Sequence, residues 1–173
     1  MNHTPPLPYT YWVEPGCLLA GPHPLRMPHA QHPAALQALV SSGITAFIDL
    51  TEPIELGGAA YPADFQQFPG GANLRYYNLP FNDFATPTVP EMRAILDLLQ
   101  TLQAQGSPAY IHCYAGVGRT GTAVGCLLAE NGFSGAAALK RLEQLRSGLP
   151  APLFPSPETK QQRAFVLSWP PAR

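Results

Sequence analysis

Charged residues are scarce in this sequence of 173 residues, where Asp, Glu, Lys and Arg together make up only 12%. Ten basic side chains against eleven acidic ones give a net charge of −1 with histidine neutral. Such a balance leaves no broad basic surface of the kind that nucleic acid or an anionic membrane selects. We therefore expect no nucleic-acid partner, and any anion that the protein binds must be held by local groups.

Long apolar runs are also missing. Residues 123–129 form one of the longest, which is far short of the roughly 18 residues that a membrane-spanning helix needs. The first eleven residues contain neither the basic start nor the apolar core of a secretory signal. These features predict a cytoplasmic protein without a membrane span.

Cysteine is rare, with only Cys17, Cys113 and Cys126 in the chain. Three thiols cannot all pair, and their spacing is not that of a zinc site, so at least one is free, as suits a reducing compartment. The histidines at 3, 23, 29 and 32 are scattered among prolines, and we interpret them as surface residues rather than metal ligands. No metal and no other cofactor is expected.

Proline and glycine are plentiful, at 21 and 15 residues, which predicts long ordered connections. The chain contains no internal repeat and no linker long enough to divide a core. We therefore expect one domain over residues 1–173, with residues 1–10 a flexible proline-rich N-terminus.

Hydrophobic periodicity predicts alternating strands and helices. Strands are expected in a hairpin over 11–19 and at 44–50, 74–79 and 109–112, and helices over 32–39, 91–105, from 118 onward, 134–145 and 158–167. This alternation predicts an α/β fold with a central, largely parallel sheet of about four to five strands flanked by helices.

The loop that leaves the strand at 109–112 carries the candidate chemistry. Residues 112–121 have the sequence His-Cys-Tyr-Ala-Gly-Val-Gly-Arg-Thr-Gly. Glycines 116 and 118 free the turn from Cβ clashes, so that successive backbone amides can converge on one tetrahedral oxyanion. The candidate phosphate-binding amides are those of Tyr114, Ala115, Gly116, Val117, Gly118 and Arg119.

Two side chains of this loop point to phosphate chemistry. The planar guanidinium of Arg119 can grip two phosphate oxygens, and the following helix adds the positive end of its dipole. The same groups favour the thiolate of Cys113, which is the nucleophilic form. Taken alone, Cys113 is better explained as a buried small apolar residue at a strand end. Its neighbours in the loop favour the nucleophile.

This stretch resembles the HCxxGxxRTG phosphate-binding loop of the cysteine-dependent protein tyrosine phosphatases, in the small dual-specificity-like branch. The likeness extends, more weakly, to residues 18–21 and 47–50. The resemblance implies a phosphatase fold and hydrolysis of phosphate monoesters through a cysteinyl-phosphate intermediate on Cys113, with Arg119 as the phosphate clamp and no cofactor.

The resemblance also implies further roles. Asp83 lies thirty residues before the cysteine, counted from 83 to 113, and is the candidate general acid; its alternative role is to solvate a turn. Thr120 would donate a hydrogen bond to the departing thiolate, and His112 would support the loop backbone. Gln162 matches the family's water-orienting glutamine, with Gln161 beside it as the alternative.

Substrate choice is less determined. The absence of lysine at positions 114, 115 and 117 disfavours a polyphosphorylated lipid, and the short chain leaves little room for a deep, tyrosine-only slot. We expect a phosphorylated protein carrying phosphotyrosine, with phosphoserine and phosphothreonine as further substrates. The alternatives are a phosphatase of a small phosphorylated metabolite or lipid, a catalytically silent phosphate-binding module, and a thiol enzyme of the rhodanese or arsenate-reductase kind.

Overall fold

The computed structural model describes residues 4–26, 32–56, 65–68, 71–151 and 154–170. Its centre is a five-stranded sheet in the order β1-β2-β5-β3-β4. The strands are β1 (Tyr11–Glu14), β2 (Leu18–Pro22), β3 (Ala46–Asp49), β4 (Arg75–Asn78) and β5 (Ala109–Cys113). β1 pairs with β2 in the antiparallel sense, and the other neighbours are parallel. The predicted α/β class with a largely parallel sheet is confirmed.

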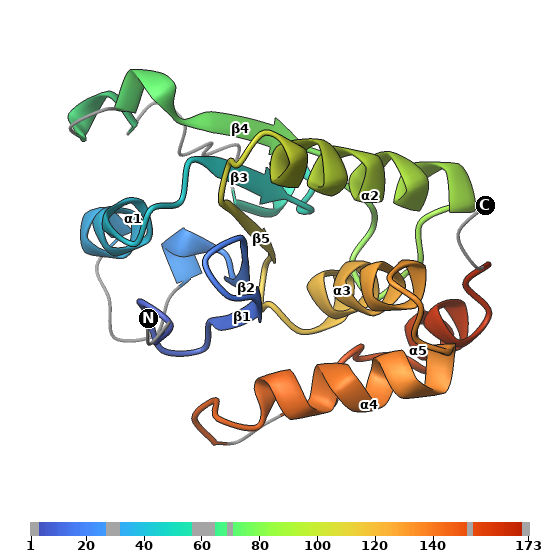
Figure 1. Cartoon of the computed structure of the whole chain (residues 1–173). Helices are drawn as coiled ribbons and strands as arrows, with labels where there is room; N and C mark the ends of the chain where they lie inside the picture. The colour runs from blue at the N-terminus through green and yellow to red at the C-terminus, as the bar shows by residue number, and fades with distance from the viewer. Residues whose placement is uncertain (1–3, 27–31, 57–64, 69–70, 152–153, 171–173) are drawn as a thin grey trace.

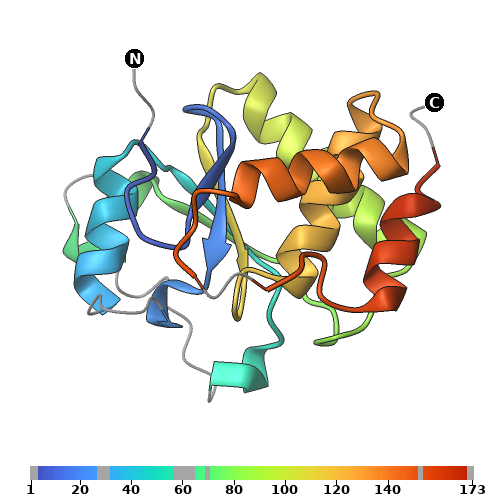
Figure 2. The same cartoon turned by 90° about the horizontal axis from the view of Figure 1, so that it is seen from below.

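Within the described residues, five α-helices cover the two faces of this sheet (Figures 1 and 2). They are α1 (His32–Ser41), α2 (Val89–Ala104), α3 (Gly118–Glu130), α4 (Gly135–Arg146) and α5 (Lys160–Leu167). Figure 1 shows α1 alone on one side of the sheet, with α2 and α3 on the other and α4 and α5 packed beyond α3. In the described part of the chain, no helix has the length and apolar character needed to cross a membrane.

Alternating strand residues divide the core between the two faces, as the two-residue period of a strand requires. Leu19, Phe47 and Tyr110 pack with residues of α1, whereas their neighbours Ala20, Ile48 and Ile111 pack with α2 and α3. All five residues of β5 are buried. The strand predicted at 109–112 therefore lies in the middle of the sheet, where both of its faces are covered.

Helix capping accounts for the main differences in element boundaries. α2 begins at Val89, two residues before the predicted start at 91, because Thr88 and Glu91 form a capping box with a proline in the first turn. Thr159 and Gln162 form a second capping box, which places the start of α5 at Lys160. β5 runs one residue further than predicted and ends on Cys113.

The N-terminal prediction lies partly outside the described residues, because residues 1–3 are among those not described. Within the described part, Leu7 packs against the core residues between the sheet and α1, and Thr10 is buried. A flexible segment over residues 1–10 and a single domain over the whole chain stay predictions.

Candidate active site

The loop between β5 and α3 is held in a tight turn at the carboxyl end of the sheet. Gly116 has φ +71°, and a Cβ at this position would overlap the backbone of Gly21 in β2. The carbonyl of Tyr114 accepts a hydrogen bond from the His23 amide at 3.1 Å, and that of Val117 accepts one from Ser156 Oγ at 2.7 Å. The loop therefore has one defined shape, with Cys113 buried at its base.

Arg119 lies in the first turn of α3 and its side chain is fully buried. Its Nη1 and Nη2 atoms donate to the two carboxylate oxygens of Glu55 at 2.5 and 2.7 Å. Nη1 also donates to the carbonyls of Leu50 and Phe81, both at 3.2 Å. Burial opposes the charge, but the hydrogen bonds from Arg119 to Glu55 and the nearby negative groups outweigh it and raise the pKa of Arg119.

One nitrogen of this guanidinium remains available. Arg119 Nε is buried and has no hydrogen-bond partner in the part of the chain that the structure describes. An unpaired buried donor is costly, and a phosphate oxygen would satisfy it. Glu55 therefore fixes the orientation of the arginine while its Nε stays free to bind an oxyanion.

Glu55 itself was not singled out in the sequence. It lies on the 3-10 turn η2 (Pro53–Leu56), after the carboxyl end of β3, and its side chain is 17% exposed. Burial raises its pKa, but the hydrogen bonds that it accepts from Arg119 outweigh this effect, so its pKa lies below the usual value. No local pattern identifies this residue, because its partner is 64 residues further along the chain.

Asp83 reaches the same arginine from the loop between β4 and α2. Its Oδ1 lies 3.2 Å from Arg119 Nη2 and accepts a hydrogen bond from the amide of Phe84 at 3.1 Å. Its side chain is 40% exposed, so it sits at the mouth of the site rather than in the core. The structure thus brings Asp83 to the loop and pairs it with Arg119.

The hydroxyl of Thr120 is buried and has no hydrogen-bond partner among the described residues. It follows Arg119 in the first turn of α3, close along the chain to Cys113. An unpartnered hydroxyl in this position is available as a donor to a ligand or to a thiolate.

Gln162 is fully buried, whereas its neighbour Gln161 is exposed. Its Oε1 accepts hydrogen bonds from the amides of Glu158 and Thr159, and its Nε2 donates to the carbonyl of Ala85 at 3.1 Å. A Cβ on Gly118 would lie 3.1 Å from both amide atoms, so Gln162 packs against the start of α3. Of the two glutamines, Gln162 is the one that lies at the loop.

A buried polar cluster supports the loop from behind. His112 Nδ1 lies 3.4 Å from the carbonyl of Cys113 and 3.8 Å from Asp49 Oδ1, and His23 Nε2 lies 3.5 Å from Asp49 Oδ2. The carboxylate of Asp49 also accepts hydrogen bonds from Thr51 Oγ1 at 2.6 Å and from Tyr76 Oη at 2.8 Å. His23 is therefore a core residue, only 1% exposed, and its interpretation as a surface histidine was wrong.

Burial decides the charge of His112 in this cluster. It lowers the pKa of His112 to about 3, against the opposing effect of Asp49, so the ring is neutral at neutral pH. Burial also disfavours the charge on Asp49, but the His112 ring and the hydrogen bonds from His23 and Thr51 outweigh it and lower the pKa of Asp49. The ligand atoms of His23, Asp49 and His112 lie within 4.8 Å of one another and could hold a metal ion. However, Thr51 and Tyr76 already donate hydrogen bonds to the two carboxylate oxygens of Asp49. This favours a cluster that supports His112 by hydrogen bonds over a metal site.

A family model of phosphatase domains matches residues 7–162 of this chain. It is PTP-SAK, described as a Swiss Army Knife protein, DSP-PTPase phosphatase domain. The chain belongs to this family of protein tyrosine and dual-specificity phosphatases.

Curated relatives agree with this placement. The chain is 32% identical over 149 residues to the dual specificity protein phosphatase CDC14AB of Danio rerio, an alignment that covers 79% of this chain and 22% of that protein. It is 31% identical over 131 residues to CDC14A of Homo sapiens, covering 69% of this chain and 19% of that protein. The chain therefore spans about a fifth of the length of these relatives.

Solved structures share the fold. A kinase associated phosphatase whose catalytic cysteine is replaced by serine aligns with a TM-score of 0.73 at 21% identity, covering 92% of both chains. PTPMT1 in complex with PI(5)P aligns with a TM-score of 0.68 at 17% identity, covering 93% of this chain and 94% of the other. At these identities the likeness establishes the fold.

Proposed function

We propose that this protein hydrolyses phosphate monoesters on proteins, as a tyrosine or dual-specificity phosphatase with Cys113 as the nucleophile. The observation that carries the proposal is the buried Arg119, which Glu55 holds in place while its Nε remains free beside the loop that begins at Cys113. A module that only binds phosphate needs the arginine and the amides, but not a cysteine at the base of the loop and a carboxylate at its mouth.

In the first step, Cys113 Sγ attacks phosphorus and the bond from phosphorus to the ester oxygen breaks. Arg119 and the amides of residues 114–119 stabilise the charge that builds up on the equatorial oxygens. Asp83 donates a proton to the leaving oxygen. Asp83 is paired with Arg119, so an entering phosphate must displace it from Nη2.

In the second step, water attacks the cysteinyl phosphate and Cys113 leaves as a thiolate. Asp83, which has lost its proton, accepts one from this water. The Thr120 hydroxyl donates a hydrogen bond to the departing sulfur. Gln162 is proposed to orient the water, which is supported by its burial against Gly118 and its hydrogen bond to the loop that contains Asp83.

The proposed substrate is a phosphorylated protein. Ile54 and Phe84, the chain neighbours of the two carboxylates that hold Arg119, have exposed apolar side chains, which suit contact with an aromatic or peptide group. The second candidate is a phosphorylated lipid, which the structural likeness to PTPMT1 with its bound PI(5)P favours. The uncharged side chains at 114, 115 and 117 favour the protein substrate. The proposed location is the cytoplasm, where the thiols stay reduced.

Replacement of the nucleophile tests this proposal directly. Cys113→Ser should abolish hydrolysis of p-nitrophenyl phosphate in the presence of EDTA, because a hydroxyl is not ionised at neutral pH. Cys17→Ser is the matched control, since Cys17 is exposed and lies at the turn between β1 and β2. Both proteins should retain the wild-type circular dichroism spectrum. Substantial activity in Cys113→Ser, or an equal loss in Cys17→Ser, would remove Cys113 from this role.

A further inference from the structure

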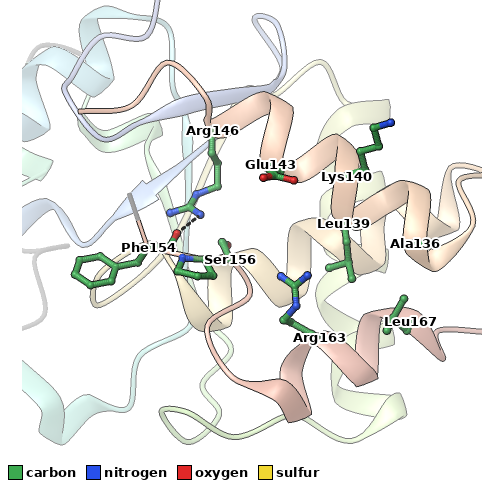
Figure 3. Close-up of a pocket in the computed structure, with 10 residues that line it drawn as sticks. Ala136, Leu139, Lys140, Glu143, Arg146, Phe154, Ser156, Arg163 and Leu167 are labelled. Carbon is green, nitrogen blue, oxygen red and sulfur yellow. Dashed lines mark hydrogen bonds between the residues drawn. The ribbon is translucent and has the colours of Figure 1, made fainter. Parts of the chain in front are cut away.

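A cleft of about 760 Å³ lies between α4 and α5, on the side of α3 away from the sheet (Figure 3). We call it the α4–α5 cleft. Its α4 wall carries Lys140, Glu143 and Arg146, which recur every three residues and so share one face of the helix. Arg163 of α5 and the segment from Phe154 to Ser156 complete it.

The charge around this cleft is unbalanced. Three of the ten basic residues of the chain line it, against the single carboxylate of Glu143. In the part of the chain covered by the structure, neither Lys140 nor Arg163 forms an ion pair with Glu143 or with any other acid. In a protein of net charge −1, this is a local excess of positive charge that attracts an anion.

Arg146 is the innermost of these cations. It is only 5% exposed, and its guanidinium points toward Phe154 and Ser156 in Figure 3. Its Nη1 donates to the carbonyl of Phe154 at 2.9 Å, whereas its buried Nε has no partner within the described residues. Burying a guanidinium without an anionic partner is costly, and a bound carboxylate or phosphate would offset that cost.

The cleft adjoins the phosphate-binding loop. Ser156 lines the cleft and donates its hydroxyl proton to the carbonyl of Val117. Arg146 and Phe154 also line a second hollow of about 440 Å³, whose lining includes residues 114–117 of the loop together with Tyr9, Pro22, Arg26, Leu149 and Pro150. A ligand with its phosphate in the loop can therefore extend past Phe154 and place a second anionic group next to Arg146.

We propose that the α4–α5 cleft binds an acidic stretch of a peptide substrate, through carboxylate or phosphate groups, while the phosphorylated residue occupies the loop. This inference rests on the proposed function for the place of the phosphorylated residue. Apolar side chains among the cations, such as Leu139, Leu167 and the exposed Phe154, suit the side chains of a peptide. A peptide that follows the second hollow, which is lined both by Arg146 and by residues 114–117, leads from the loop to the cleft.

Two fluorescein-labelled phosphotyrosine peptides of equal length test the proposal, one flanked by Asp and Glu and the other by Asn and Gln. Binding to the Cys113→Ser protein is measured by fluorescence anisotropy, and KM and kcat are measured with the unlabelled peptides and active protein. We expect the acidic peptide to bind about tenfold more tightly and to have a lower KM, with kcat unchanged.

The decisive variant is the double substitution Lys140→Ala with Arg163→Ala, which should remove most of this preference. Its matched control is Arg141→Ala with Lys160→Ala, which removes the same charge from the same two helices at exposed positions that do not line the cleft. The control should keep the preference. Both double variants should hydrolyse p-nitrophenyl phosphate like the wild type, because that substrate does not reach the cleft.

Three results would overturn the proposal: no preference for the acidic peptide in the wild type, an equal loss of preference in both double variants, or tighter cleft-dependent binding of phosphatidylinositol phosphate vesicles than of the peptide. The anisotropy measurement does not depend on turnover. If the wild type fails to hydrolyse any phosphoester but the acidic preference persists and depends on Lys140 and Arg163, the proposed catalysis is wrong and the binding site stands.

Discussion

Arg119 is a fully buried cation whose position is set by two carboxylates from other parts of the chain. A guanidinium can be buried at acceptable cost only where its charge is paired and its donors are satisfied. Glu55 provides two parallel hydrogen bonds, and Asp83 provides a more exposed, longer contact. Glu55 is therefore the residue that orients the Arg119 guanidinium, and Asp83 is the more weakly held partner.

Removal of the charge on Glu55 should show whether Glu55, rather than Asp83, sets the orientation of Arg119. In Glu55→Gln one hydrogen bond to Arg119 can persist, but the ionic partner is lost and Asp83 becomes the main counterion of the arginine. We expect kcat for p-nitrophenyl phosphate to fall by at least about tenfold, with a smaller change in KM. Steady-state kinetics of Glu55→Gln and of its neighbour Glu52→Gln test this, and similar losses in both variants would contradict it.

His112 makes the stability of the fold dependent on pH. Its pKa is about 3 in the folded protein, against an ordinary value of 6.5. Between these two values the unfolded chain binds a proton that the folded protein does not, so the free energy of unfolding must fall as the pH is lowered below 6.5.

Urea unfolding at a series of pH values measures this effect. His112→Asn can keep a donor near the Cys113 carbonyl but cannot titrate, so its free energy of unfolding should depend less on pH between 6.5 and 4 than that of the wild type. Parallel pH profiles for the two proteins would show that His112 does not carry the dependence.

At the scale of elements, close packing between α3 and the segment before α5 holds the loop between β5 and α3 in place. Gly121 lies in α3 opposite Ser156, and a Cβ on Gly121 would overlap Ser156 Oγ, which holds the Val117 carbonyl of the loop. Alanine in place of glycine inside a helix ordinarily stabilises it by about 1 kcal/mol. Here the overlap should reverse that sign.

Gly121→Ala should therefore lower both the thermal midpoint and the phosphatase activity. The double variant Gly121→Ala with Ser156→Ala removes the overlapping oxygen and should recover part of the stability. Gly148→Ala is the control, because a Cβ there meets no atom within 4 Å. Calorimetry and p-nitrophenyl phosphate assays on the wild type, the two Gly121→Ala proteins and Gly148→Ala measure these changes in stability and activity. A stabilised Gly121→Ala variant would mean that Ser156 moves without affecting the loop.

The elements that periodicity could predict are those whose pattern arises from burial. β3 and β5 appear as short apolar runs because both faces are covered, and α2 shows a 3.6-residue period because one face meets the core. The 3-10 turn Pro53–Leu56, which carries Glu55, was not predicted, because this irregular stretch shows no hydrophobic periodicity. The positions of Cys113 and Arg119 could be predicted because both residues lie in one continuous stretch of sequence, the loop at 112–121. The pairing of Arg119 with Glu55 could not, because it depends on how distant segments meet.

At the scale of the whole molecule, the parallel arrangement of the sheet assembles the site. β3, β4 and β5 run in the same direction, so the segments that follow them emerge at one edge. These segments carry Glu55, Asp83 and the loop that begins at Cys113. α5 adds Gln162 from beyond α3. The proposed oxyanion site therefore exists only in the folded chain, and any ligand of this site must stabilise the fold.

This linkage predicts a thermal shift on binding of tungstate, an oxyanion that resembles phosphate. A ligand present at 100 times its dissociation constant stabilises the folded state by about 2.7 kcal/mol, which for a domain of this size raises Tm by roughly 5–10 °C. Arg119→Lys keeps the charge but loses the planar pair of donors, so most of the shift should disappear. Lys140→Ala, which leaves the loop untouched, should keep it. Differential scanning fluorimetry with and without tungstate measures all three proteins. A full shift in Arg119→Lys would place the oxyanion somewhere other than the loop at the end of β5.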